Sequence, residues 1–261
     1  MQPRLDVGGV IRRVFDIYVD QASVLMPAAV VVFVFTGIIS ALLVAASAGL
    51  ALVAVLISLV AITLFTGMVV ELVADVQDGR RDASASQLLQ AATPVLGQLI
   101  LVGIVAGIGI VVGFILIIVP GLILITIWSV AAPVVVLERP RGVLAALARS
   151  RELVRGNGWQ VFGVILVLYI LVGAVSIIIE GIAESAGSGV GIVVRVIVGV
   201  LTAPLSALAA SVLYFELRGA RAAGDEFGAG GPGPGGPGPG DPVAPAGPST
   251  GGSDAERAFG A

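Results

Sequence analysis

The sequence contains no cysteine and no histidine, and its 14 Lys+Arg residues are all arginines. Without cysteine there are no disulfides and no thiol chemistry, and without histidine or lysine there are no imidazole bases, Schiff bases or usual zinc ligand sets. Charged residues of both signs make up only 12% of the chain. A Gly-rich phosphate loop, a nucleophile elbow and an EF-hand pattern are also missing. These absences predict a protein that is not an enzyme and that uses no cofactor and no metal.

Hydrophobic residues, by contrast, account for 57% of the 261 residues, and the mean hydropathy is +1.10. This composition leaves too few polar side chains to cover a soluble globule of this size. The N-terminus lacks the order of basic, apolar and small residues that marks a removable signal peptide, so the first span is expected to direct insertion. The sequence therefore predicts an all-α fold, a polytopic membrane helical bundle.

Turn and charge signals divide the apolar runs into six predicted transmembrane helices, each near the roughly 20 residues that a span requires. Ser47-Ala48-Gly49 separates the first two, and Pro120-Gly121 suits the centre of a type II turn between the third and fourth. The spans are predicted at 23–47, 50–74, 96–118, 122–137, 159–179 and 190–215. The fourth is short for a hydrocarbon layer of about 30 Å. The 96–137 hairpin is therefore expected either to cross fully, with tilt or local thinning, or to be re-entrant.

An amphipathic helix is predicted before each of the three hairpins. Residues 5–20 place apolar side chains at helical spacing on one face and charges on the other. Ser84 and Gln87 fit a capping box that opens a second helix. A third lies within 138–159 and is expected to end at Gly156-Asn157-Gly158. Such helices, leading directly into apolar runs, are expected to lie along the headgroup layer as interfacial helices.

The positions of the arginines predict the orientation. Six crossings place both termini and every arginine except Arg195 on one side, and short arginine-bearing flanks stay inside during insertion. The termini are thus predicted to be cytoplasmic, in the plasma membrane. Arg195 is expected either to extend to the outer interface or to pair with Glu180 and Glu184. Gly/Pro-rich composition predicts a disordered cytoplasmic tail at 222–261 after a six-span domain at 1–221.

Charged residues at the span boundaries are candidates for a structural or functional role. Each returning span ends at a glutamate, and an R-x-x-D/E pattern precedes the first and third hairpins. We expect the glutamates to face arginines of the interfacial helices and to tie each helix to its hairpin. The alternative is a cation or proton site, because ionisable groups within membranes often mark pathways. The candidates are Glu71, Glu138, Glu216, Arg13, Asp16, Arg149, Glu152 and Arg155.

Small residues spaced by four occur twice in the third span, at Gly103/Gly107 and at Gly109/Gly113. Such spacings let helices approach closely. We expect close packing within the bundle, and the alternative is a dedicated dimerisation face.

The segment from Ile127 to Val164, IWSVAAPVVVLERPRGVLAALARSRELVRGNGWQVFGV, carries a family resemblance. Trp128, Pro133 and Glu138, with the ALARS run at 146–150 and Trp159, resemble the membrane domain associated with glycerophosphoryl diester phosphodiesterases. The resemblance extends over about residues 5–221. It implies a largely uncharacterised family of multi-pass proteins, named for members that are fused to a soluble phosphodiesterase. This sequence contains no such soluble domain, so the resemblance implies neither phosphodiesterase activity nor catalytic residues.

The function that we expect is non-enzymatic: a membrane-embedded scaffold or accessory component beside lipid or envelope enzymes or transporters. The expected partners are membrane lipids and a membrane protein, not nucleic acid. The alternative is a transporter or channel for a small or lipid-like molecule, although the predicted spans offer few polar side chains for hydrophilic cargo. In a third interpretation, the amphipathic helices sense or bend membranes.

Overall fold

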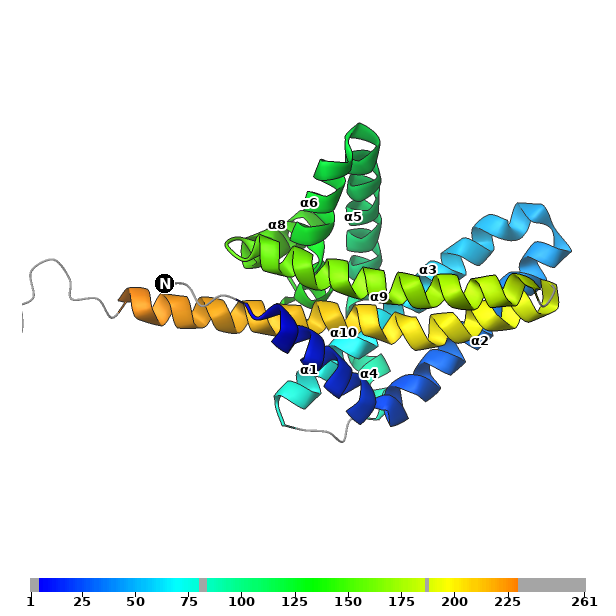
Figure 1. Ribbon diagram of the computed structural model, residues 1–261, viewed down its shortest axis with the longest axis horizontal. Coiled ribbons are helices and arrows are strands. Elements are labelled where there is room, and N and C mark those ends of the chain that lie inside the picture. The colour runs from blue at the N-terminus through cyan, green and yellow to red at the C-terminus, as the bar shows by residue number, and fades with distance from the viewer. Residues whose placement is uncertain (1–4, 80–83, 186–187, 230–261) are drawn as a thin grey trace, which may run out of the picture.

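The computed structural model describes residues 5–79, 84–185 and 188–229. Within these ranges the chain forms helices and no strands, as expected of an all-α protein (Figure 1). The elements are α1 (Val7–Asp20), α2 (Ala22–Ala46), η1 (Ala48–Leu50), α3 (Ala51–Gln77), α4 (Ala85–Ala92), η2 (Thr93–Val95), α5 (Leu96–Leu116), α6 (Ile118–Trp128), α7 (Ala131–Pro133), η3 (Val134–Glu138), α8 (Val143–Val154), α9 (Gly158–Ser185) and α10 (Ser188–Ala229).

Long apolar helices dominate the structure. Over the described residues, six helical segments are long and apolar enough to cross a membrane. They correspond to the six apolar runs identified in the sequence, so the coarse prediction of a membrane-type helical protein is confirmed. The segments are Ala22–Ala46, Ala48–Gln77, Ala85–Leu116, Ile118–Glu138, Gly158–Ile177 and Ile197–Ala223.

Local signals placed several helix ends correctly. Ser47 is extended between α2 and η1, and its Oγ accepts a hydrogen bond from the Gly49 amide at 3.2 Å. The capping box is present at the start of α4, with Ser84 as N-cap and Gln87 closing it. α8 ends at Val154, two residues before Gly156, whose φ of +98° is one that glycine adopts without steric cost.

The turn predicted at Pro120-Gly121 is wrong. The chain turns at Ile117, which is extended with φ −161° and ψ 148°, and both predicted turn residues lie inside α6. Proline is tolerated there because the first-turn amides of a helix have no intrahelical acceptor. Gly121 has a packing role instead, since a Cβ at this position would approach the Phe114 ring to 2.5 Å.

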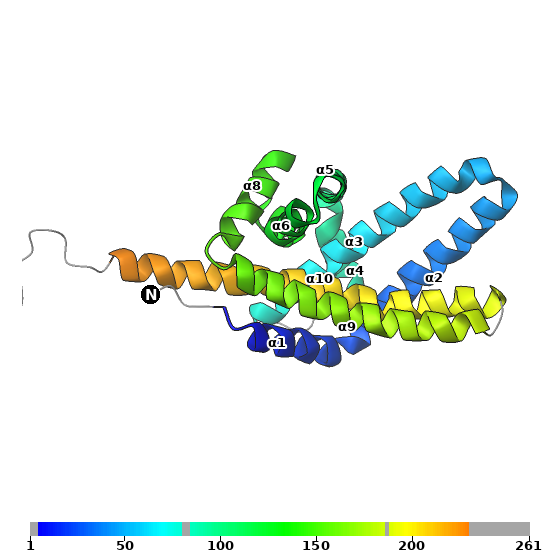
Figure 2. The same cartoon turned by 45° about the horizontal axis from the view of Figure 1, so that its top comes forward.

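Consecutive long helices pack as pairs, α2 with α3, α5 with α6, and α9 with α10. The α5–α6 pair runs across the α9–α10 pair in Figure 1. The two pairs also point in different directions in the turned view of Figure 2. The short helices cover the region where the pairs converge, with α1 against α9 and α10, α4 against α3, and α8 against α5 and α6. We call this region the base. Its core includes Val14, Val73 and Tyr214, each fully buried.

Glycines on α5 differ in what they face. A Cβ on Gly109 would lie 2.6 Å from the Trp128 ring, and one on Gly113 would lie 3.1 Å from the backbone of α6. A Cβ on Gly103 or Gly107 would meet nothing within 4 Å. The second pair therefore serves close packing of α5 on α6, whereas the first pair makes no such contact with the described residues.

At the C-terminal end, α10 continues to Ala229, past the boundary predicted at residue 221. Ala222 and Ala223 favour helix, and the dense Gly/Pro run follows only later in the sequence. Residues 230–261, where the rest of the predicted tail falls, lie outside the described residues. The side chains of Glu180, Glu184 and Arg195, for which an outer pairing was considered, are also outside them.

Candidate functional site

Most of the candidate charged residues meet at the base. Glu138 is the last residue of η3, a π-helical turn, and Arg139 after it has a left-handed backbone with φ 47°. π turns are rare and frequently occur at functional sites, and positive φ is uncommon for residues other than glycine. This irregular backbone ends the α6–η3 segment and leads into α8.

Glu138 uses both of its carboxylate oxygens. Oε2 accepts a hydrogen bond from Arg149 Nε at 2.8 Å, and Oε1 accepts one from the Tyr214 hydroxyl at 3.0 Å. Tyr214 is fully buried, and the Glu138 side chain is 25% exposed. Hydrogen bonds to an ionised group are roughly twice as strong as neutral ones. Glu138 thus connects α8 and α10 at a site that is partly shielded from solvent.

The network continues along α8. Arg149 Nη1 donates to Glu152 Oε2 at 3.1 Å, and Arg221 Nη1 lies 3.7 Å from Glu152 Oε1. Two contacts therefore tie α8 to α10, one through Glu138 and one through Glu152. We call Glu138, Arg149, Glu152, Tyr214 and Arg221 the base cluster.

The charge of Arg149 is stabilised by this arrangement. The hydrogen bond that Arg149 donates to Glu138 is the largest cause that raises the pKa of Arg149, with partial burial opposing it and Glu152 adding to it. The guanidinium therefore stays charged throughout the physiological pH range. Arg149 therefore places a constant positive charge between Glu138 and Glu152.

A second ion pair holds α1. Arg13 Nη1 donates to Glu216 Oε1 at 3.1 Å, and Arg13 Nη2 donates to Gln77 Oε1 at 2.9 Å. One arginine of α1 therefore contacts both α10 and the end of α3. Glu138 and Glu216 thus face arginines of amphipathic helices, as predicted. The prediction that each helix is tied to its own hairpin is wrong for both, because α8 follows the hairpin that Glu138 ends, and α1 packs along α10 and brings Arg13 to Glu216.

Glu71 is the glutamate that faces no arginine of an amphipathic helix among the described residues. Its electrostatic partner is Arg139, in the connection between η3 and α8. Asp16 lines a small cavity of about 210 Å³ beside Arg13 and Asp20. Arg155 is the C-cap residue that follows α8, and its amide donates to the Arg151 carbonyl at 3.1 Å.

Sequence reasoning missed several polar contacts of the base. Tyr214 lies in the last apolar run, and 76 residues separate it from Glu138. Ser150 donates to the Ile127 carbonyl at 2.8 Å, and Gln98 donates to the Pro140 carbonyl at 2.7 Å. No spacing rule connects residues so far apart in the chain. All of these contacts fasten α8 and the segment before it to neighbouring helices.

The chemistry available at this site is limited by these contacts. A general acid or base must reach a substrate proton within hydrogen-bond distance, and both Glu138 oxygens already have partners. Among the described residues, no group of three or more Asp, Glu, His or Cys side chains is placed to hold a metal ion. The arrangement serves best as a clamp between helices.

Comparison with known proteins adds one family. A family model described as Domain of unknown function (DUF8558) matches residues 85–217. The match begins at α4 and ends within α10, and it covers slightly more than half of the 261 residues. It includes every member of the base cluster except Arg221. No curated protein and no solved structure matches the chain.

Proposed function

The chain belongs to this family of unknown function, DUF8558, and we propose that it is a non-enzymatic multi-pass membrane protein, a scaffold or accessory component beside lipid or envelope enzymes or transporters. The base cluster supports this proposal. Its carboxylates and arginines bond to one another, which holds α8 and α10 together and leaves Glu138 without a free oxygen. A rigid base that supports diverging apolar helix pairs suits a protein that positions others within the membrane.

In the proposed arrangement, the six apolar helices cross the membrane as three hairpins, and α1, α4 and α8 lie at the cytoplasmic interface. Exposed apolar residues on or beside the short helices support it. Trp159 is 85% exposed, Leu144 is 76% exposed and Val19 is 69% exposed. Such side chains are favourable where headgroups meet hydrocarbon, and tryptophan is enriched at that depth. The α5–α6 pair runs across α9–α10 (Figure 1), so the two pairs differ in tilt relative to a flat membrane.

The proposed location is the plasma membrane with both termini in the cytoplasm, which the arginine distribution supports. The resemblance to the membrane domain associated with glycerophosphoryl diester phosphodiesterases supports an accessory role, because that domain occurs fused to an enzyme. We therefore propose membrane lipids and a membrane protein as the partners.

The second candidate function is a transporter or channel for a small or lipid-like molecule. A cavity of about 490 Å³ among α2, α3, α6, α9 and α10 favours it. The cavity has no charged lining residue among those described, which favours lipid-like over hydrophilic cargo.

The test is gentle extraction of the full chain from its own membranes, followed by quantitative mass spectrometry of the bound proteins and lipids. We expect one protein partner in stoichiometric amount, whose activity in liposomes changes when the chain is added. The purified chain alone is expected not to hydrolyse glycerophosphodiesters or phospholipids. Turnover by the chain alone, lost in Glu138→Gln and kept in Glu216→Gln, would show an enzyme and overturn the proposal. Flux through liposomes without any partner would instead favour the transporter.

A further inference from the structure

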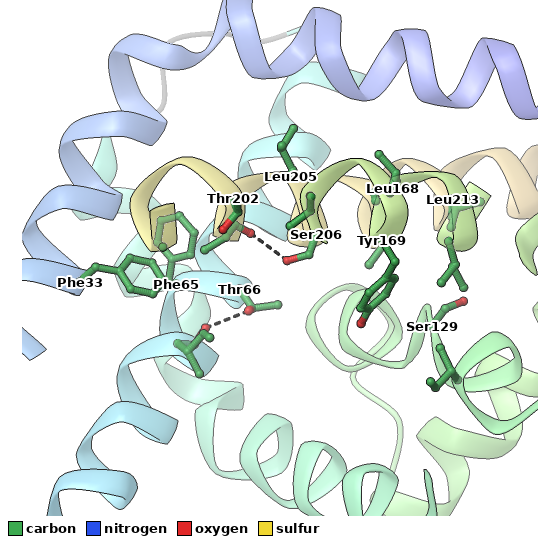
Figure 3. Close-up of a pocket in the computed structure, with 18 residues that line it drawn as sticks. Phe33, Phe65, Thr66, Ser129, Leu168, Tyr169, Thr202, Leu205, Ser206 and Leu213 are labelled. Atoms are coloured by element: carbon green, nitrogen blue, oxygen red, sulfur yellow. Dashed lines mark hydrogen bonds between the residues drawn. The ribbon is translucent and has the colours of Figure 1, made fainter. Parts of the chain in front are cut away.

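One cavity lies between the long helices, with walls from all three helix pairs. It occupies about 490 Å³, within the range of roughly 300–1,000 Å³ that is common for ligand sites. Figure 3 shows its walls, with Phe33 from α2, Thr66 from α3, Ser129 after α6, Tyr169 from α9 and residues of α10 around it. Every lining residue falls within one of the candidate membrane spans. The medium around this cavity is therefore hydrocarbon if those helices cross the membrane.

Five residues with hydroxyl groups line the cavity, and four of these hydroxyl protons are directed to the backbone. Four of them donate to backbone carbonyls of their own segments, a common way for serine and threonine to be satisfied in helices. They are Thr66 to Ile62 at 2.8 Å, Ser129 to Thr126 at 2.9 Å, Thr202 to Val198 at 2.7 Å and Ser206 to Ala203 at 3.0 Å. Ordered water or a polar ligand requires several polar partners. These four groups offer no free donor, and the fifth hydroxyl, on Tyr169, belongs to a side chain that is 68% exposed, so the cavity favours an apolar occupant.

The shape of the cavity favours a chain over a compact molecule. Tyr169 is 68% exposed and Ile62 is 46% exposed, so the cavity reaches the outer surface of the helices. A second cavity of about 270 Å³ between α2 and α3 shares the lining residues Phe33 and Ile62. Phe33 and Phe65 pack edge to face, with ring centroids 5.8 Å apart, and form a wall of the larger cavity. The second cavity is lined further along α2 by Thr36, Gly37 and Ser40, so cavity space lies on both sides of Phe33 and Ile62.

We propose that this cavity binds one acyl chain of a membrane phospholipid. Because lipid tails are as apolar as the lining, the hydrophobic effect does not favour binding here. The favourable free energy comes from van der Waals contacts between the acyl chain and lining atoms that otherwise lack partners. The inference rests on the membrane location in the proposed function and not on the accessory role. It concerns α2, α3, α6, α9 and α10, and no residue of the base cluster lines the cavity.

Photolabelling of the purified full chain tests the proposal. The probe is phosphatidylglycerol with a diazirine in one acyl chain, added at increasing concentration in detergent micelles and followed by peptide mass spectrometry. We expect labelling to saturate at about one lipid per chain, the stoichiometry of a single built site, and to concentrate near Leu168 and Tyr169.

Gly199→Leu is the variant that fills the cavity. A Cβ at Gly199 meets only Phe33, at 3.5 Å, so the backbone accepts it and the larger side chain occupies the space of the ligand. We expect saturable labelling to fall about tenfold, because an acyl chain would overpack a cavity that the leucine side chain already fills. Gly103→Leu on α5 is the matched control, because a Cβ there meets nothing within 4 Å and the residue does not line the cavity. Ala203→Phe is the second filling variant if Gly199→Leu does not fold.

Three results would overturn the proposal. The first is labelling that spreads over the exposed apolar surface without saturation. The second is equal labelling of the wild type and of a folded filling variant. The third is saturation by a photoreactive free fatty acid but not by the phospholipid, which would assign the cavity to a different lipid. None of these experiments involves a protein partner, so the accessory role is tested separately.

Discussion

Replacing Glu138 by glutamine tests the central contact of the base cluster. Glutamine keeps the size of the side chain and removes its charge. Its carbonyl oxygen still accepts from Arg149, and its amide faces the Tyr214 hydroxyl, which rotates to accept. A hydrogen bond to a charged group contributes about 1.5–3 kcal/mol, against about 0.5–1.5 kcal/mol for a neutral one.

The expected loss follows from this difference and from the partial exposure of the pair. The side chains are 25% and 35% exposed, so solvent screens part of the interaction. We estimate that Glu138→Gln lowers the free energy of unfolding by about 1–2 kcal/mol. For a chain of this size, that corresponds to a melting temperature lower by about 3–6 °C. Glu138→Ala is expected to cost about 1–3 kcal/mol more, because it leaves the fully buried Tyr214 hydroxyl without this acceptor.

The other two boundary glutamates are the matched controls. The Arg13–Glu216 pair has side chains that are 48% and 38% exposed, so Glu216→Gln is expected to cost about 0.5 kcal/mol. Glu71→Gln is expected to change the melting temperature less than Glu138→Gln or Glu216→Gln, because the interaction of Glu71 with Arg139 is an electrostatic attraction at a distance.

The assay is thermal unfolding of the three purified variants in one detergent, with the wild type alongside. The predicted order of destabilisation is Glu138→Gln first, then Glu216→Gln, then Glu71→Gln. A double-mutant cycle with Tyr214→Phe should show coupling to Glu138. Three equal shifts, or an unchanged melting point for Glu138→Gln, would show that the base cluster does not hold α8 to α10.

Further predictions concern packing, topology and pH. Gly113→Ala should lower the melting temperature, because its Cβ would lie 3.1 Å from the α6 backbone, whereas Gly103→Ala should leave it unchanged. Equal effects of the two variants would contradict the conclusion that Gly113 is required for close packing of α5 on α6. Because the chain has no cysteine, a single introduced cysteine can be labelled selectively. A membrane-impermeant maleimide should label Ser47→Cys from outside the cell, and it should also label Ile117→Cys if α5 and α6 cross the membrane fully. No labelling of Ile117→Cys would indicate that the α5–α6 hairpin is re-entrant. Burial raises the pKa of Tyr18 above its usual 10.0, so its contribution to stability is present below pH 10 and is lost as the pH rises through the higher folded pKa. Melting curves of Tyr18→Phe should show a smaller loss above pH 10, and an identical loss would exclude this residue as its source.

Elements whose signals are local could be predicted from the order of residues along the chain. Apolar runs set the long helices. The break at Ser47 and the cap at Ser84 each depend on a hydrogen bond between that serine and a residue two or three positions later. Gly156 ends α8 because its own backbone takes a positive φ. Each of these features depends on residues within one or two helical turns, so reading the chain in order was sufficient.

Where local signals were ambiguous, packing decided. Pro120-Gly121 fits a turn and also fits the first turn of a helix, and the close approach of Phe114 to Gly121 is compatible with the helix that forms. The pairs Gly103/Gly107 and Gly109/Gly113 on α5 share one spacing, yet only the pair that faces α6 is required to be small.

Only the tertiary structure decided which charges meet and where an apolar cavity forms. Arg13 lies 203 residues from Glu216 in the sequence, and the contact exists because α1 packs along α10. Tyr214 and Glu138 meet in the same way, across elements that no periodicity relates. The cavity needs five helices to diverge at particular angles, and those angles follow from how side chains interlock between helices rather than from composition. Sequence patterns report what each helix is, whereas the packing of one helix on another determines what the assembled molecule can bind.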